Sequence, residues 1–248
     1  MKTCWAACLG GCSDTISREH LVSRNLFVDE ELTVEGFPWC KGQSVKVGLG
    51  ALTSKILCKK HNSDLSDVDA IGGKTFAAFR ETRRLANIRE KKQKYRWTIV
   101  RTTIDGLGFE RWCLKTLINL SYDRDKPIGR DSLHPGKPSD RLVRIAYGLE
   151  PFVGKGGLYF ITRVGMNIQS EDRVGFRPLS KQLGNIEGGF FSIRGLSFLL
   201  YLEPEGPPNL TGVQVFGENL GNAMVNHRMR EIKVMNGKYL SELQTFEW

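Results

Sequence analysis

The stretch Leu57-Cys58-Lys59-Lys60-His61-Asn62 places a cysteine and a histidine at the entrance to a long helical pattern. Two residues separate Cys58 from His61, and this spacing lets both side chains bind one tetrahedral metal ion. Apolar residues then recur at helical spacing over residues 65–88, with Gly72-Gly73 as an expected weak point or break in the helix. The stretch therefore predicts a metal-bound turn that leads into a helix.

The distribution of the cysteines favours a metal site over a disulfide framework. Five of the six cysteines lie within the first 58 residues. A secreted disulfide scaffold would be shorter and denser in cysteine, and nothing in the sequence directs export. Cys4, Cys8 and Cys12 follow one another at intervals of four residues, and Gly10-Gly11 permits the tight turn that the backbone then needs.

We predict a structural zinc site of three cysteines and one histidine. Its expected ligands are Cys12, Cys58, His61 and Cys8, with Cys4 as the alternative to Cys8. Cys40 stays open as a further candidate. The competing interpretation is that these cysteines are buried core residues, which are common in folded proteins.

The composition is that of an ordinary globular chain with an excess of positive charge. The 248 residues (28.0 kDa) are 40% hydrophobic and 25% charged, which argues against wholesale disorder. No run of about eighteen apolar residues occurs, so we expect no membrane span and a cytoplasmic protein. The net charge of +9 favours a polyanionic partner, although charge alone does not separate nucleic acid from an acidic membrane surface.

Much of this charge lies between Lys74 and Arg101, where ten basic residues accompany only Glu81 and Glu90. A run of this density and single sign suits a surface that faces phosphates, while a solvated helix face is the plainer interpretation. The helical residues expected to contact nucleic acid are Arg80, Arg83, Arg84, Lys91 and Lys92.

The rest of the sequence predicts an α+β fold dominated by antiparallel strands. We expect helical turns in residues 17–27, a strand at 95–104, a long loop at 123–140, and an amphipathic helix at 109–120 that carries Cys113 on its apolar side. Short β-type runs are expected at 32–34, 45–47, 142–147, 157–164, 189–193, 196–203, 213–216 and 231–235.

No long helical pattern separates the strands of the C-terminal half, so a parallel sheet is not expected there. These patterns divide the chain into three segments. The expected segments are a zinc-bound module at 1–73, a linking segment of basic helix, strand and amphipathic helix at 74–122, and a β-rich domain without a functional motif at 123–248.

The N-terminal quarter carries three features in order. A cysteine pair, Cys8 and Cys12, comes first, and the acid–histidine dipeptide Glu19-His20 follows it. A second zinc pair, Cys58 and His61, is followed at once by Asn62. This order resembles the HNH endonuclease family, the ββα-metal nucleases, in their zinc-bearing form. The resemblance covers about residues 4–70 and is one of spacing. His61 stands where a fourth cysteine is more common, and Thr53 and Ser54 stand where the family has its middle asparagine.

The resemblance implies a metal-dependent endonuclease that hydrolyses phosphodiester bonds, with double-stranded DNA as the expected substrate. His20 would activate water as the base, and Glu19 and Asn62 would hold a catalytic Mg²⁺ or Mn²⁺. The zinc would pin the turn that carries His20 against the helix that carries Asn62. The neighbouring basic residues expected to meet phosphates are Arg18, Arg24, Lys59 and Lys60.

Two alternative functions stay open. In the first, the chain is a non-catalytic zinc-finger protein that only binds nucleic acid, and His20 has a structural role. In the second, it is a metal-stabilised protein-interaction module whose positive charge serves solubility.

Overall fold

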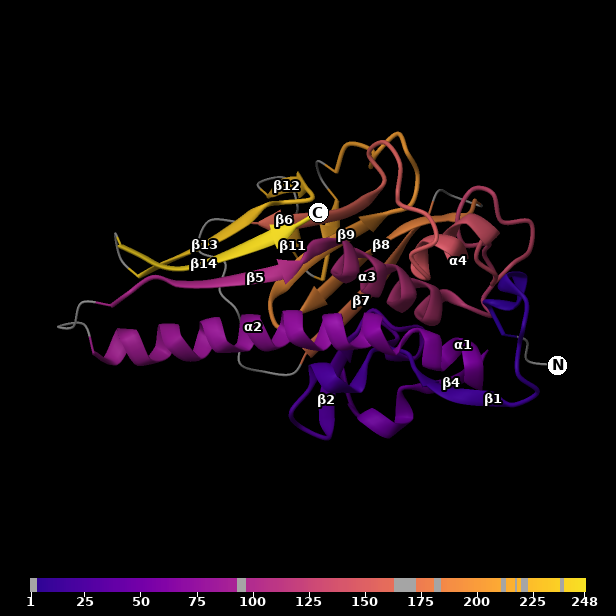
Figure 1. Ribbon diagram of the computed structural model, residues 1–248, viewed down its shortest axis with the longest axis horizontal. Coiled ribbons are helices and arrows are strands. Elements are labelled where there is room, and N and C mark those ends of the chain that lie inside the picture. The colour runs from indigo at the N-terminus through magenta and orange to yellow at the C-terminus, as the bar shows by residue number, and fades with distance from the viewer. Residues whose placement is uncertain are drawn as a thin grey trace.

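The structure, a computed structural model, describes residues 4–92, 97–162, 173–180, 184–210, 213–216, 218–219, 223–236 and 239–248 (Figure 1). Within these residues strands predominate over helices, so the predicted α+β class is confirmed. No helix in the described ranges combines the length and the apolar character that a bilayer crossing requires.

Over the described residues the main sheet has seven strands, and two of them come from the N-terminal quarter. Its order is β12 (Met224–His227), β6 (Gly157–Thr162), β9 (Leu196–Tyr201), β8 (Ile186–Ile193), β7 (Arg173–Ser180), β2 (Glu31–Glu35) and β3 (Val45–Gly48). Neighbours are antiparallel except β2 and β7, which are parallel. The sheet therefore combines strands from the first 73 residues with strands from residues 123–248.

A second sheet of three strands lies against the long helix α2 (Ser66–Lys91). Its order is β13 (Glu231–Asn236), β14 (Tyr239–Glu247) and β5 (Val100–Asp105), with β5 parallel to β14. Arg89 of α2 is buried beneath this sheet and donates to the Ser241 carbonyl oxygen at 2.8 Å. The C-terminal strands thus fix the far end of the basic helix.

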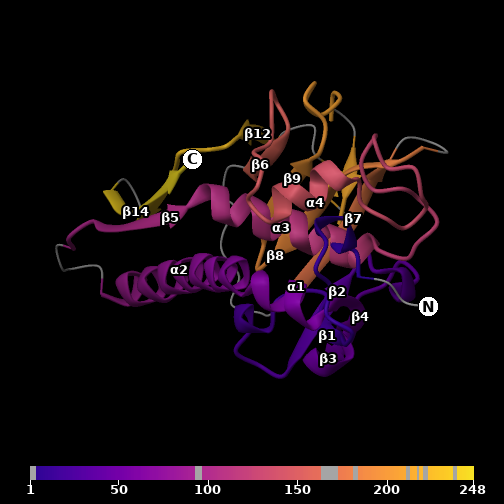
Figure 2. The same ribbon diagram turned by 45° about the vertical axis from the view of Figure 1, so that its right-hand side comes forward.

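Helix α3 (Gly106–Ser121) lies between α2 and the main sheet, and it is buried along almost all of its length (Figure 2). The Asp105 side chain caps its first turn by accepting a hydrogen bond from the Gly108 N–H at 2.7 Å. Cys113 is fully buried on this helix, as predicted for a core residue. Because α3 touches both layers, its few polar side chains can reach either of them.

The Gly72-Gly73 pair is a contact between helices and not a break. Helix α2 runs unbroken through both glycines. A Cβ atom on Gly72 would lie 2.4 Å from the nearest ring atom of Trp112, and one on Gly73 would lie 2.5 Å from the Asn25 side chain. The glycines therefore let α3 and the segment after β1 approach α2 closely, and this packing offsets their poor helix propensity.

The N-terminal quarter also contains a separate hairpin that leads into a helix. Strand β1 (Ile16–His20) pairs antiparallel with β4 (Thr53–Cys58), and α1 (Lys59–Asp64) begins at once after β4. Glu19 is paired with Ser54 and His20 with Thr53, and a bulge lies between Ser17 and Glu19. This strand–strand–helix unit carries the candidate site residues. The short elements elsewhere are η1 (Ala7–Leu9), η2 (Arg24–Leu26), η3 (Pro38–Cys40), η4 (Leu49–Ala51), β10 (Gln214–Val215) and β11 (Glu218–Asn219).

Several strand predictions are confirmed, and two local ones are wrong. The runs at 32–34, 45–47, 189–193 and 231–235 are strands, and 109–120 is helical. Residues 17–27 were expected to form a turn into one or two helical turns. A helical turn is present at η2, but pairing with β4 makes 16–20 a strand. Residues 142–147 were expected to be a strand but belong to α4 (Asp140–Ala146), because the Ser139 hydroxyl accepts a hydrogen bond from the Leu142 N–H and caps a helix there.

Candidate functional site

Four side chains converge at the junction of β4 and α1 to form a group that can hold a metal ion. Cys4, Cys12, Cys58 and His61 bring their ligand atoms within 4.8 Å of one another. The His61 Nδ1 atom lies 3.4 Å from the Cys4 sulfur, 3.5 Å from the Cys12 sulfur and 3.3 Å from the Cys58 sulfur. One ring nitrogen therefore faces all three sulfurs, as it would if they shared a central ion.

Local backbone structure explains why these residues meet. Cys58 is the N-cap of α1, and its sulfur accepts a hydrogen bond from the His61 N–H at 3.5 Å. The loop that carries Cys4 and Cys12 docks on the same junction, where the Lys60 N–H donates to the Ser13 hydroxyl at 3.2 Å. Gly10 and Gly11 have φ values of +73° and +62°, so glycine supplies the left-handed turns between the two cysteines.

The three thiols of this group differ in acidity. Burial raises the pKa of the Cys4 thiol to about 12, and the pKa of Cys12 is also raised. Burial acts in the same direction on Cys58, but hydrogen bonds from His61 and Ser13 outweigh it and lower the pKa to about 6. Cys58, at the helix N-terminus, is therefore the most acidic of the three thiols.

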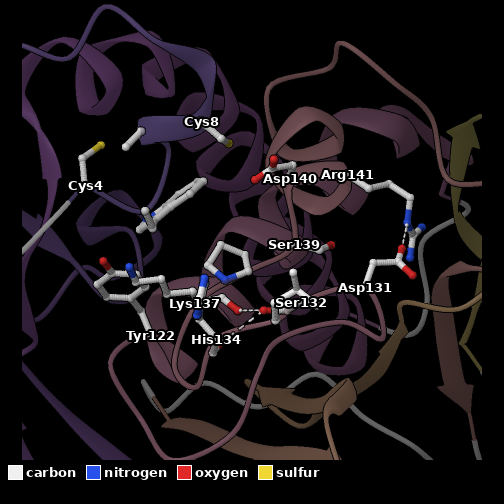
Figure 3. Close-up of a pocket in the computed structure, with 14 residues that line it drawn as sticks. Cys4, Cys8, Tyr122, Asp131, Ser132, His134, Lys137, Ser139, Asp140 and Arg141 are labelled. Atoms are coloured by element: carbon white, nitrogen blue, oxygen red, sulfur yellow. Dashed lines mark hydrogen bonds and ion pairs between the residues drawn. The ribbon is translucent and has the colours of Figure 1, made fainter.

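Cys8 does not join this group, and the structure places Cys4 there in its stead. Cys8 lines a pocket of about 500 Å³ that lies between the N-terminal loop and the segment 131–141 (Figure 3). Its thiol lies beside Asp140, and burial together with that carboxylate raises the pKa of Cys8 to about 11. Cys8 is therefore a neutral thiol at physiological pH. Cys40 is buried elsewhere, where its thiol donates to the Val34 carbonyl oxygen at 3.7 Å.

The polar groups of this pocket are largely engaged with one another. Arg141 donates to Asp131 at 3.2 Å, and the Ser132 hydroxyl donates to the Lys137 carbonyl oxygen at 2.7 Å. Both contacts are visible in Figure 3. The pocket adjoins the Cys/His group because Cys4 lines both.

Glu19 is the centre of a buried charged cluster. Its side chain is 6% exposed, and Oε1 lies 2.6 Å from Nζ of Lys115, which is 1% exposed. The same ammonium lies 2.6 Å from each carboxylate oxygen of Asp69, whose side chain is 26% exposed. Burial raises the pKa of Glu19, although the positive charge of Lys115 opposes that shift. One cation therefore serves two carboxylates, and only Asp69 reaches solvent.

Hydrogen bonds extend this cluster to both sides. Ser23 donates to Asp69 at 2.5 Å and accepts from the Trp112 indole N–H at 2.9 Å. On the other side, the Asn119 amide nitrogen lies 3.3 Å from Glu19 Oε1. The cluster thus joins the end of β1, the start of α2 and one face of α3.

His20 lies next to the cluster, at the end of β1, and is half-buried. Burial lowers its pKa, the positive charges of Arg24 and Lys115 lower it further, and Asp69 opposes them. A neutral imidazole is therefore favoured at physiological pH, which is the form that can accept a proton. Asn62 is half-buried on α1, one residue after the metal-group histidine.

The basic residues expected to contact phosphates lie in different environments. Arg84 binds Glu81 through two hydrogen bonds of 2.6 and 2.7 Å, and Arg80 donates to the Leu26 carbonyl oxygen. Lys60 pairs with Asp64 at 2.8 Å. Arg83 is half-buried, and the residues with exposed side chains are Arg18, Arg24, Lys59, Lys60, Arg84, Lys91 and Lys92.

Sequence patterns did not identify Lys115, Asn119 or Asp69 as members of this site. One signal was present: Lys115 and Asn119 are one turn apart on a helix that is otherwise apolar over most of its length. Such residues on a fully buried helix need a partner, because an unpaired buried charge or amide is costly. That partner, Glu19, lies about a hundred residues earlier in the sequence, so a local sequence pattern could not have predicted the contact.

Comparisons with protein-family models, with curated proteins and with solved structures find no match to this chain. The function therefore has to be inferred from the geometry and chemistry of the site.

Proposed function

We propose that this chain is a metal-dependent endonuclease whose N-terminal strand–strand–helix unit is held together by zinc. The observation that carries the proposal is the Cys/His group, which joins the loop before β1 to the β4–α1 junction. Strand β1 then carries Glu19 and His20 alongside β4. The same order of zinc ligands, acid–histidine dipeptide and helix underlies the resemblance to HNH endonucleases.

Zinc is the metal that this donor set favours. Three sulfurs and one imidazole nitrogen form a closed tetrahedral set of the kind found in structural zinc sites. Typical Zn–S and Zn–N bonds of about 2.3 and 2.0 Å give a sulfur–nitrogen edge of about 3.5 Å in a tetrahedron. The three sulfur–nitrogen separations here are 3.3, 3.4 and 3.5 Å. With four protein ligands the ion has no open position, so its proposed role is structural.

His20 is the proposed general base. Its lowered pKa leaves the imidazole neutral and able to take a proton from the attacking water. A divalent Mg²⁺ or Mn²⁺ would supply the positive charge that the phosphate needs in the transition state. Glu19 and Asn62 are its proposed ligands, and Lys115 has to release Glu19 for that cation to bind. The amide nitrogen of Asn119 lies 3.3 Å from the His20 carbonyl oxygen. Thr53 and Ser54, which stand where the HNH family has its middle asparagine, have no side-chain amide that could make this backbone contact.

Double-stranded DNA is the proposed substrate, since exposed basic residues flank the site. Arg18 and Arg24 lie on either side of the Glu19-His20 dipeptide, and Lys59 and Lys60 begin α1. Contacts of this kind position a phosphate backbone without reading its sequence. We expect binding to weaken steeply with salt as the condensed counterions are released.

Cleavage of a supercoiled plasmid tests the proposal. Purified chain with Mn²⁺ or Mg²⁺ is expected to nick the plasmid, and His20→Ala is expected to lower the rate at least 100-fold. His134→Ala is the matched control, because His134 is an exposed histidine remote from β1 in sequence. Equal cleavage by the His20→Ala variant and the wild type would overturn the role of His20.

A zinc-stabilised protein that binds nucleic acid without cutting it is the second candidate. The observation that favours it is the Glu19–Lys115 ion pair, which neutralises the proposed metal ligand inside the fold. Under this candidate, the chain retains DNA at low salt and releases no nicked product with either cation. The same plasmid preparation, examined for retention and for nicking, separates the two functions.

A further inference from the structure

The side chain of Asn119 bridges three segments that are far apart in the sequence. Its Oδ1 atom accepts a hydrogen bond from the Trp5 indole N–H at 3.0 Å. Its Nδ2 atom lies 3.3 Å from Glu19 Oε1 and 3.3 Å from the His20 carbonyl oxygen. Asn119 is 3% exposed and Trp5 is 5% exposed, so water has little access to the bond between their side chains. We call these three contacts the Asn119 bridge.

The chemistry of its partners fixes the orientation of the bridge. An indole N–H can only donate, so Oδ1 of Asn119 has to face Trp5. The amide nitrogen then faces Glu19 and the His20 carbonyl, both of which accept. If the carboxamide were flipped, its NH₂ group would face the Trp5 N–H, and its oxygen would face Glu19 and the His20 carbonyl oxygen. Both contacts would then be unfavourable. The bridge therefore has one stable arrangement.

Trp5 connects the bridge to the Cys/His group. It follows Cys4 directly, and its backbone N–H donates to the Ile56 carbonyl oxygen of β4 at 3.0 Å. Its ring also packs edge-on against Tyr147, whose hydroxyl donates to the His61 carbonyl oxygen at 2.8 Å. Cys4 is thus bonded directly to Trp5, and His61 is reached from Trp5 through Tyr147.

We propose that Asn119 is a positioning residue that couples metal occupancy of the Cys/His group to the geometry of Glu19 and His20. When the ion holds Cys4 in place, Trp5 presents its N–H to Asn119, and the amide of Asn119 then holds β1 at Glu19 and His20. The proposal rests on the proposed function for its catalytic consequence. The coupling itself depends only on contacts between described residues.

Coupling of this kind acts in both directions. If the ordered metal loop stabilises the bridge, the bridge must stabilise the ordered metal loop by the same factor. A change at Asn119 is therefore expected to loosen a metal site that it does not touch. A change at Trp5 is expected to alter the surroundings of His20, which Trp5 reaches through Asn119.

Two single variants of the full chain test the coupling. Asn119→Asp keeps an acceptor for Trp5 and replaces the donor to Glu19 and His20 with a carboxylate oxygen, whereas Trp5→Phe removes the N–H and keeps an aromatic ring. Ser121→Ala is the control, because Ser121 is buried on the same helix and its hydroxyl has no partner among the described residues. Circular dichroism and thermal unfolding establish that each purified variant is folded.

The first measurement is the rate at which zinc-loaded protein releases zinc to an excess of chelator. Asn119→Asp and Trp5→Phe are each expected to release zinc about tenfold faster than the wild type, because either change breaks the bridge between the metal loop and β1. The double variant is expected to release zinc less than 100-fold faster, because the two changes break one bridge. Release at the wild-type rate by both folded single variants would overturn the coupling.

The second measurement is the NMR signal of the His20 ring in zinc-loaded protein, assigned by its loss in His20→Gln. Trp5→Phe is expected to shift this signal, and Ser121→Ala is expected to leave it unchanged. An unchanged His20 signal in Trp5→Phe would overturn the positioning role. If the wild type cleaves no DNA, the proposed function fails, and these two measurements still decide the coupling. If it does cleave, Asn119→Asp is expected to lower kcat and leave KM unchanged.

Discussion

Replacing Lys115 with methionine removes the cation that pairs with both Glu19 and Asp69. Methionine preserves most of the apolar volume of the lysine side chain, so the change acts mainly on charge. Asp69 is 26% exposed and can recover hydration, whereas Glu19 is 6% exposed and cannot. The destabilisation is therefore expected to come mainly from Glu19, because an unpaired buried charge is strongly unfavourable.

The magnitude is bounded by the cost of protonating Glu19. With an ordinary carboxyl pKa of 4.5 in the unfolded chain, uptake of one proton costs about 3.4 kcal/mol at pH 7 and about 0.7 kcal/mol at pH 5. In the variant, the folded state binds this proton and the unfolded state does not, so stability falls as pH rises through this window. Lys115→Met is thus expected to lose about 3 kcal/mol at pH 7 and far less at pH 5.

Urea unfolding of the wild type and Lys115→Met at both pH values provides the assay. The double variant Lys115→Met/Glu19→Gln is expected to recover most of the loss at pH 7, because the buried side chain at position 19 then carries no charge. Lys60→Met, which removes an exposed lysine paired with Asp64, is the control and is expected to show no measurable change. A deficit that is equal at pH 5 and pH 7 would refute the reasoning.

Three further predictions concern the metal group and the packing of α2. After dialysis, metal analysis is expected to find one zinc per chain in Cys8→Ser and no zinc in Cys4→Ser. Loss of zinc from Cys8→Ser alone would contradict the proposed ligand set. Cys58 has a pKa of about 6, whereas the pKa values of Cys4 and Cys12 are raised, so zinc binding is expected to release about two protons. The zinc affinity should therefore rise about 100-fold per pH unit between pH 7 and 8. A competition titration that finds a slope near zero would rule this out. Gly72→Ala would place its Cβ 2.4 Å from the Trp112 ring and is expected to cost about 1–3 kcal/mol in thermal unfolding, whereas no loss would show that the helices can separate freely.

The sequence was most informative where structure is local. The two-residue spacing of Cys58 and His61 fixes their approach, because the turn between them is the first turn of α1. Equal spacing made Cys4 and Cys8 indistinguishable, and their difference arises from η1, which directs Cys8 toward Asp140. Which of Cys4 and Cys8 joins the metal group depends on how the N-terminal loop docks on α4, and the spacing of the cysteines in the sequence does not predict this contact.

Long-range pairing could not be predicted from the same patterns. The parallel contact of β2 with β7 joins residues about 140 positions apart, and β5 with β14 is a similar case. Hydrophobic alternation identifies strands but carries no information about which strand is the neighbour. The charged cluster around Glu19 was missed for the same reason, since Lys115 belongs to a helix of another layer.

X-ray absorption at the zinc edge tests the metal centre on which the proposed function and the Asn119 bridge both depend. The purified chain is expected to contain one zinc, with three sulfur neighbours at about 2.3 Å and one nitrogen neighbour at about 2.0 Å. Cys8→Ser is expected to give the same spectrum. A protein without bound zinc, or a spectrum with fewer than three sulfur neighbours, would contradict the account.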